Sequence, residues 1–229
     1  MKLKKYFASL IHFFYPPLCF VCKEALLNQE KYICTACLCK APIIRAEMQH
    51  HIETLFWGII PIQRSSTLWY YNKGSDYAHL IHAIKYENQP LLAQYLGEML
   101  ANQELKSLFF NDIDFIVPIP VHKDRLKQRG YNQAEQIAVG INLATNIPID
   151  TTSIIKETAT QSQTSKSGYE RHLNPLKSFK VTDHSKFINK HILLVDDVIT
   201  TGATIMACAE ELLDTPGIKI SIMSICASK

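Results

Sequence analysis

The sequence predicts an α/β protein, with a mostly parallel β-sheet flanked by helices and a small cysteine-bearing module at the N-terminal end. Short runs rich in β-branched and aromatic residues alternate with stretches of helical periodicity from residue 65 onward. Helices that connect successive strands make those strands parallel. Four cysteines in two C-x2-C pairs come before this region, and 229 residues are enough for one medium domain plus an appendage.

The composition is that of a globular chain without a strong charge bias. The chain is 47% hydrophobic and 20% charged, with a net charge of +3, and its lysines and arginines are spread along its length. The net charge alone therefore does not indicate nucleic acid as a partner. The apolar run near the N-terminus is too short for a signal peptide, contains His12 and meets Pro16 and Pro17. No run approaches the roughly 20 apolar residues of a membrane span, so we expect a cytoplasmic protein without membrane contact.

The two C-x2-C pairs predict a zinc site. They are separated by eleven residues, and two such short turns can present four thiolates to one tetrahedral ion. The ligands would be Cys19, Cys22, Cys34 and Cys37. Two disulfides are the alternative, which the odd total of seven cysteines disfavours. Cys39 is either a spare thiol or a replacement for Cys37.

The sequence divides into a zinc module, residues 1–45, and an α/β domain, residues 46–229. A connector from Ala41 to Ile60 joins them. We interpret its pair His50-His51 as a solvated loop pair, because no cysteine or carboxylate lies at ligand spacing.

Each element of the α/β domain has its own pattern. Strands are predicted where β-branched and aromatic residues concentrate, at 65–71, 114–120, 149–157, 191–198 and 217–226. One or two helices are expected over 75–105, and single helices over 132–145 and 203–213. Ligands of such folds bind at the carboxyl ends of the strands, so polar residues that follow a strand are the candidates for a site.

The stretch "ILLVDDVITTGAT" places two carboxylates at the end of a buried strand. Asp196 and Asp197 follow four apolar residues, and a turn of small and hydroxyl residues leads into a helix. Such a turn offers amides, hydroxyls and a helix N-terminus to a phosphate. The carboxylates require donors, which the hydroxyls of a ribose supply, with Mg²⁺ nearby to offset charge. The pattern predicts a cradle for ribose 5-phosphate, whose phosphate contacts are Thr200, Thr201, Gly202, Ala203 and Thr204.

Two other interpretations explain this stretch less well. A receiver domain also opens with paired acids, but most of its sheet follows them, and few residues follow Asp197 here. A capped turn between strand and helix accounts for one Asp and one Thr. It does not account for three threonines and a glycine within five residues.

A basic segment follows the predicted strand at 114–120. If it is helical, two of its basic residues share one face and two share another, because residues four apart stack. One face can address a substrate while the other meets solvent or nucleic acid. The first face carries Arg125 and Arg129, and the second carries Lys123 and Lys127. A solvated basic face is the alternative. Lys85, near the end of a predicted helix, is a weaker candidate.

The polar run from Thr158 to Asn174 lacks apolar periodicity and lies between two predicted strands. Its simplest role is a lid that closes over the site and excludes water. A disordered surface loop is the alternative.

These motifs together resemble the ComF family of competence-associated proteins, which are similar to type I phosphoribosyltransferases. The resemblance covers nearly the whole chain, from "FFYPPLCFVC" through "VPIPVHKDRLKQRGYNQAEQIA" to "VDDVITTGAT". Its pattern of Gln, Arg, Asn and Phe falls on Gln163, Arg171, Asn174 and Phe179. Where relatives often carry a second basic residue, this chain has Thr158, with Lys156 nearby.

The resemblance implies binding of 5-phosphoribosyl-1-pyrophosphate (PRPP) with Mg²⁺, and a structural Zn²⁺. Asp196 and Asp197 would hold the ribose and Arg129 the pyrophosphate of a phosphoribosyltransferase. A second function, from another class, is a single-stranded DNA-binding protein that keeps the PRPP pocket for sensing and binds the strand through Lys123, Arg125, Lys127 and Arg129. The resemblance also implies a role in DNA uptake, with proteins of the competence machinery as partners.

Overall fold

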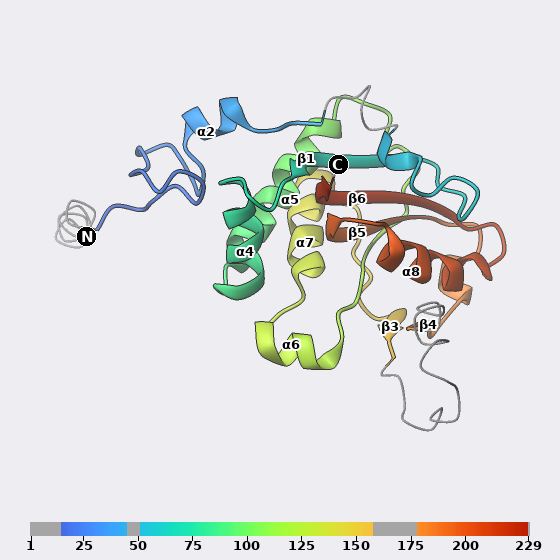
Figure 1. Ribbon diagram of the computed structural model, residues 1–229. Coiled ribbons are helices and arrows are strands. Elements are labelled where there is room, and N and C mark those ends of the chain that lie inside the picture. Colours follow the sequence, from blue (N-terminus) through green and yellow to red (C-terminus); the bar gives the residue numbers. More distant parts are fainter. Residues whose placement is uncertain (1–14, 45–50, 158–177, 229) are drawn as a thin grey trace, which may run out of the picture.

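The computed structural model describes residues 15–44, 51–157 and 178–228 (Figure 1). Its main sheet has four parallel strands in the order β1-β6-β5-β2. The strands are β1 (Ser65–Tyr71), β2 (Phe115–Pro118), β5 (His191–Ile199) and β6 (Lys219–Ser228). The predicted parallel sheet with flanking helices is confirmed.

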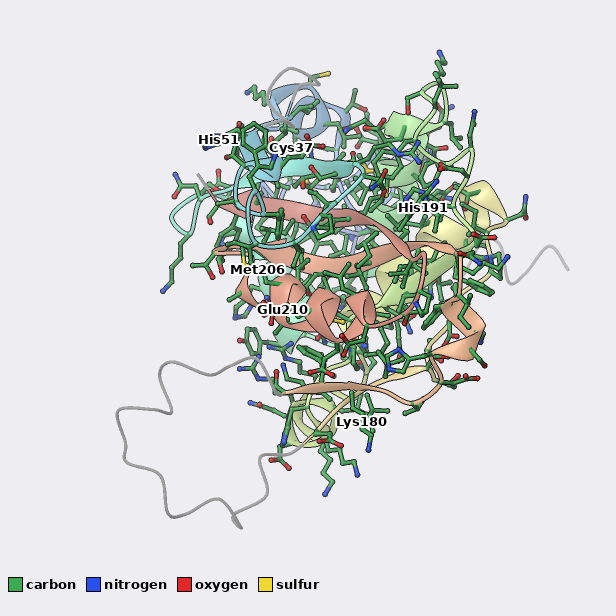
Figure 2. The ribbon with its side chains drawn as sticks, turned by 90° about the vertical axis from the view of Figure 1, so that its right-hand side faces the viewer. Cys37, His51, Lys180, His191, Met206 and Glu210 are labelled. Carbon is green, nitrogen blue, oxygen red and sulfur yellow. The ribbon has the colours of Figure 1, made fainter. Side chains whose placement is uncertain are left out.

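The helices lie on both faces of this sheet (Figure 1). One face is covered by α4 (Ala78–Tyr86), α5 (Pro90–Glu104) and α7 (Gln133–Thr145), and the other by α8 (Ala203–Leu213). Figure 2 shows His191, the first residue of β5, at the other end of the sheet from Met206 in the first turn of α8. The carboxyl end of β5 therefore lies beside the N-terminus of α8.

Alternation along β5 builds a separate core on each face. Ile192 and Leu194 pack with α8, whereas Leu193 and Val195 pack with α4, α5 and α7. All four side chains are fully buried, as expected for the central strand of a parallel sheet. The continuous apolar run in the sequence reflects this burial on both faces.

The helices α5 and α7 pack with their backbones in contact. A Cβ on Gly97 would lie 2.2 Å from the Ile137 carbonyl oxygen, and one on Gly140 would lie 1.9 Å from the Gln94 carbonyl oxygen. Only glycine allows this approach at either position. The close contact fixes α7, and with it the basic segment that precedes α7 in the chain.

The strand predicted over 149–157 does not join the main sheet as a continuous strand. Ile149 forms a single parallel bridge with Ile116, and then β3 (Ile154–Lys156) pairs antiparallel with β4 (Phe179–Val181) in a sheet of their own. Asp150 causes the break, because its carboxylate accepts hydrogen bonds from the amides of Thr152 and Ser153 and so turns the chain.

The cysteine-bearing segment packs on the α4–α5 face of the α/β domain. Its short helix α2 (Thr35–Lys40) contributes Cys37 to the same hydrophobic core as α4 and α5. The Tyr77 hydroxyl donates to the Cys37 carbonyl oxygen at 2.6 Å, and the Tyr32 and Tyr95 rings lie 5.3 Å apart. The segment is therefore anchored to the domain by core packing as well as by the chain.

Parts of the predicted connector are built into the domain. Ile43 bridges Trp69 of β1 in antiparallel fashion, and the Phe56 side chain is fully buried on the α8 face. His51 is exposed in a helical turn, and His50 lies outside the described residues. No helix in the described ranges is long and apolar enough to cross a membrane.

Candidate functional site

The two aspartates lie near the carboxyl end of the central strand. The strand continues to Ile199, so Asp196 and Asp197 are within its last four residues rather than just beyond it. Asp196 is partly exposed, whereas Asp197 is only 8% exposed. The Asp197 amide donates to Oδ1 of Asp196 at 2.8 Å. The strand thus presents two adjacent carboxyl groups at the edge where ligands of parallel sheets bind.

The pKa of Asp196 is raised to about 7, first by burial and then by the neighbouring charge of Asp197. The hydrogen bond from the Asp197 amide and the positive charges of Lys85 and Lys156 oppose this rise. Asp196 therefore changes charge near neutral pH.

Lys85 is a member of the site. Its Nζ lies 3.0 Å from Oδ2 of Asp197, and the two side chains are 22% and 12% exposed. The ion pair joins the last turn of α4 to the end of β5. Sequence reasoning ranked Lys85 low because a lysine at a helix end is usually only solvated; its partner, Asp197, lies 112 residues away in the sequence.

The turn after β5 has the geometry of an anion cradle. Gly202 is the residue before α8 and takes the left-handed conformation, with φ of 75°. Thr200, Thr201, Ala203 and Thr204 are exposed, and the hydroxyl of Thr201 accepts from the amide of Ala203 at 3.4 Å. The N-cap residue, Gly202, has no side chain that could cap the helix, and the first turn carries no acid. The N-terminus of α8 is thus open to a negatively charged group.

A second cation flanks the acids from the β3–β4 pair. Burial lowers the pKa of Lys156 and the charge of Arg125 adds to this, whereas Asp196 acts to raise it. Its Nζ also lies 4.7 Å from the centre of the Phe179 ring. Lys156 therefore supplies positive charge near Asp196. It comes two residues before Thr158 in the sequence.

Arg129 is held by contacts with Gln133 and Tyr86. Its Nη1 donates to Oε1 of Gln133 at 2.7 Å, and its Cζ lies 5.6 Å from the centre of the Tyr86 ring. Its Nε is buried and, within the described ranges, has no hydrogen-bond partner. Burial raises the pKa of Tyr131 to about 12, and the charges of Arg129 and Asp197 oppose each other at this phenol. Tyr131 therefore lies within electrostatic range of both Arg129 and Asp197.

The basic segment is helical, which is the condition under which its basic residues are expected to share faces. It forms α6 (Lys123–Arg129), which begins after His122 and ends at Gly130 with φ of 80°. Lys123, Arg125 and Lys127 are exposed, whereas Arg129 is partly buried. The charge of Arg125 acts on Lys156 and that of Arg129 on Tyr131, and each of these two residues also senses one of the acids.

The four predicted zinc ligands form one cluster. Their sulfur atoms all lie within 4.8 Å of one another, and the Sγ atoms of Cys22 and Cys34 are 3.7 Å apart. Zn–S distances near 2.3 Å place tetrahedral ligands about 3.8 Å apart. All seven cysteines lie in the described ranges and are free thiols, so the disulfide alternative does not describe this structure. Cys39 is exposed and outside the cluster.

Backbone donors favour negative charge at Cys19, whereas burial and the neighbouring thiols raise the pKa of Cys37. Burial acts to raise the pKa of the Cys19 thiol, but amide donors, including those of Cys34 and Val21, outweigh it and lower the pKa to about 7. Thiolates are the form that binds metal. The donor set and spacing fit a Zn²⁺ ion.

Several sequence candidates are not tested by this geometry. The lid from 158 to 174 lies outside the described residues, together with Gln163, Arg171 and Asn174. Phe179, the first residue of β4, is buried, and Nζ of Lys156 lies over its ring. Cys208 and Cys226 are buried, as expected for small core residues.

Residues 84–228 match a family described as "Phosphoribosyl transferase domain". "DNA utilization protein YhgH" of Escherichia coli strain K12 is 25% identical over 228 residues, which cover 92% of this chain and 97% of that protein. "Competence protein F" of Haemophilus influenzae is 30% identical over 131 residues, covering 55% and 57% of the two chains. These matches confirm the resemblance expected from the motifs.

Solved structures with a similar arrangement include a purine phosphoribosyltransferase from Pyrococcus horikoshii, with a TM-score of 0.35, 17% identity and coverage of 58% of this chain and 80% of that one. A glutamine PRPP amidotransferase from B. subtilis has a TM-score of 0.38 and 21% identity, with coverage of 57% of this chain and 25% of that one.

Proposed function

Because this chain belongs to the phosphoribosyl transferase domain family, we propose that it binds PRPP at the carboxyl edge of its sheet and transfers the phosphoribosyl group to an acceptor. Asp196 and Asp197 bind the ribose hydroxyls, and the turn from Thr200 to Thr204 binds the 5-phosphate.

One observation carries the proposal. The paired carboxylates on β5 are followed within five residues by the left-handed Gly202 and the open N-terminus of α8. The first group accepts hydrogen bonds from hydroxyls, and the second donates to a phosphate. A ribose 5-phosphate carries the matching groups, hydroxyls for the carboxylates and a phosphate for the helix N-terminus. It places them on opposite sides of one small ring.

The cations around the acids support binding of the pyrophosphate. Arg129 has a buried Nε without a partner in the described ranges, and its guanidinium is a planar donor that matches phosphate oxygens. Lys85 and Lys156 add positive charge on either side of the acids. Mg²⁺ bound with PRPP would offset the charge of the pyrophosphate, with Asp196 and Asp197 as the carboxylates within reach.

In the transfer reaction, the bond between the anomeric carbon and the pyrophosphate oxygen breaks as the acceptor bonds to that carbon. Pyrophosphate leaves with the bonding electrons, and the acceptor loses a proton. Arg129 stabilises the charge that develops on the leaving group, and the two acids orient the sugar for attack.

A second function, binding of single-stranded DNA, is favoured by a different observation. The exposed surface of α6 presents Lys123 and Lys127, with Asp124 as the single acid of the helix. Exposed cations of this kind contact phosphates, and relatives carry names that refer to DNA utilisation and competence. The two functions are compatible, because they use different residues of the same helix, the lysines for DNA and Arg129 for pyrophosphate.

We also propose that the cluster of Cys19, Cys22, Cys34 and Cys37 holds one structural Zn²⁺. The shared core with α4 and α5 supports a structural role, because the ion would fix residues that pack directly on the domain.

Thermal melting tests the PRPP site. PRPP with Mg²⁺ at about 100 times its dissociation constant stabilises the folded state by about 2.7 kcal/mol, and the melting temperature should rise accordingly. Ribose 5-phosphate should give a smaller rise because it lacks the pyrophosphate. Absence of any shift at millimolar PRPP contradicts the proposal.

A further inference from the structure

Three planar side chains gather on the last turn of α4, at the rim of the site. Tyr86 ends the helix and is 59% exposed. The Cζ of Arg129 lies 5.6 Å from the centre of its ring, and the His82 ring lies 5.1 Å from it at an angle of 48°. His82 is held by Glu87, whose Oε1 lies 3.0 Å from its Nδ1. PRPP binding as proposed above uses the Arg129 guanidinium but neither ring.

This rim cluster, His82, Tyr86 and Arg129, is fixed beside the acids. Lys85 comes immediately before Tyr86 and pairs with Asp197 at 3.0 Å. The Tyr131 hydroxyl donates to the carbonyl oxygen of Ile84, which ties the segment after α6 to the same turn of α4. A group that stacks on Tyr86 therefore contacts the residue next to Lys85, whose side chain pairs with Asp197.

The exposure of the cluster favours one base of a long ligand over a small enclosed molecule. Nucleobases stack on tyrosine rings and on guanidinium planes, and this contact tolerates any base. Arg129 also ends α6, whose outer face carries the exposed Lys123 and Lys127. A strand whose phosphates lie along that face can bring a base to Tyr86 within a few nucleotides.

We propose that the rim cluster stacks a base of single-stranded DNA and so positions a nucleotide of that strand beside the PRPP site. This proposal rests on the DNA binding proposed above and adds to it a contact that depends on bases. It also separates two kinds of contact by residue, with the α6 lysines on phosphates and Tyr86 on a base.

The test compares two ligands of equal charge by fluorescence anisotropy. One is a 15-nucleotide strand of thymidines, and the other is an abasic strand of the same length. Loss of one base stack by alanine substitution lowers affinity by about fivefold or more. Tyr86→Ala should therefore bind the thymidine strand at least about fivefold more weakly than wild type does. Its affinity for the abasic strand and the salt dependence of its binding should equal those of wild type. Tyr86→Phe should retain wild-type affinity, because the ring remains.

Tyr15→Ala is the matched control, since Tyr15 is an exposed tyrosine, 81% accessible, in the cysteine-bearing segment. It should leave both affinities unchanged. Equal weakening of both strands by Tyr86→Ala, no weakening of either, or a loss confined to Tyr15→Ala overturns the stacking proposal. A wild-type protein that binds neither strand overturns it together with the DNA-binding function. The PRPP-dependent melting shift of Tyr86→Ala should match wild type, which separates this contact from the PRPP site.

Discussion

The ammonium group of Lys85 lies 3.0 Å from the carboxylate of Asp197, across the junction between α4 and the central strand. Both side chains are less than a quarter exposed. The ammonium group of Lys85 therefore balances the charge of Asp197 before any ligand binds. The acid that precedes Asp197 in the sequence, Asp196, has a pKa raised to about 7 by burial and by the Asp197 charge. The site therefore holds one carboxylate that is paired and one that changes charge near neutral pH.

Lys85→Met should destabilise the protein at pH 8 by up to about 3 kcal/mol, because it leaves Asp197 buried without its cation. The positive charge of Lys85 also lowers the pKa of Asp196, so the variant should titrate Asp196 at higher pH. Denaturant unfolding measures the first effect. Lys219→Met, at an exposed position at the start of β6, is the control and should change stability by less than about 0.5 kcal/mol. Equal stability of the two variants would mean that the Lys85 pair contributes nothing.

Asp196→Asn should stabilise the protein increasingly as the pH rises from about 4 to about 8. The native state keeps a proton on Asp196 up to about pH 7, whereas the unfolded state releases it near its ordinary pKa of 3.8. In wild type this contribution to stability is present below about pH 4 and is lost as the pH rises through 7. Asparagine does not titrate. The difference in melting temperature between variant and wild type, measured at pH 5 and pH 8, should be larger at pH 8; a constant difference contradicts the raised pKa.

PRPP affinity should rise between pH 6 and pH 8. Ribose hydroxyls donate to an ionised carboxylate, so below the Asp196 pKa of about 7 binding must first remove a proton. The expected loss approaches tenfold per pH unit on the acid side, once the ligand's own phosphate titration has been measured and subtracted. Asp196→Asn provides the comparison, because its affinity should lack this component.

Gly202→Ala should both destabilise the fold and weaken PRPP binding. Its Cβ would lie 2.9 Å from Cε1 of Phe56 and 3.2 Å from Cε of Met206, at a residue whose φ is 75°. Gly58 has a similar φ of 72° but open space around the added Cβ. Gly58→Ala therefore carries only the conformational cost of about 1 kcal/mol and should leave PRPP affinity intact. Chemical unfolding and PRPP-dependent melting of the two variants isolate the effect of the clash with Phe56; equal results for both would argue against a role for the turn.

One Zn²⁺ should be found per chain, and Cys37→Ser should lose it while Cys39→Ser keeps it. Cys37 belongs to the four-sulfur cluster and to the core shared with α4 and α5, whereas Cys39 is exposed. Elemental analysis gives the metal content. Cys37→Ser should also lower the melting temperature of the whole protein, because the lost ion would no longer fix a segment that shares a core with α4 and α5. Full zinc content in Cys37→Ser would contradict the assigned ligand set.

The elements of the fold follow from local patterns, and the pairs within the site do not. The four-apolar run before Asp196 predicts a central strand, and 203–213 reads as a helix with the bounds of α8. The strand predicted over 149–157 is wrong in its middle, because the Asp150 side chain captures the local amides. Lys85 and Asp197 are 112 residues apart in the sequence, and Tyr86 and Arg129 are 43 apart. Only the packing of α4 on β5 and α6 brings the members of each pair together. Hydrophobic periodicity contains no information on such contacts.

Calorimetric titration of PRPP with Mg²⁺ into the wild-type protein and into Asp196→Asn/Asp197→Asn tests the central claim most directly. The site at the end of β5 predicts one PRPP per wild-type chain. In the double variant, which keeps the shape of both side chains, the ribose loses two charge-assisted hydrogen bonds, each stronger than a neutral one by about 1 kcal/mol. The affinity should therefore fall by tenfold or more at pH 8. Absence of binding heat in wild type, or equal affinity in the two proteins, would show that these carboxylates do not hold the ribose of PRPP.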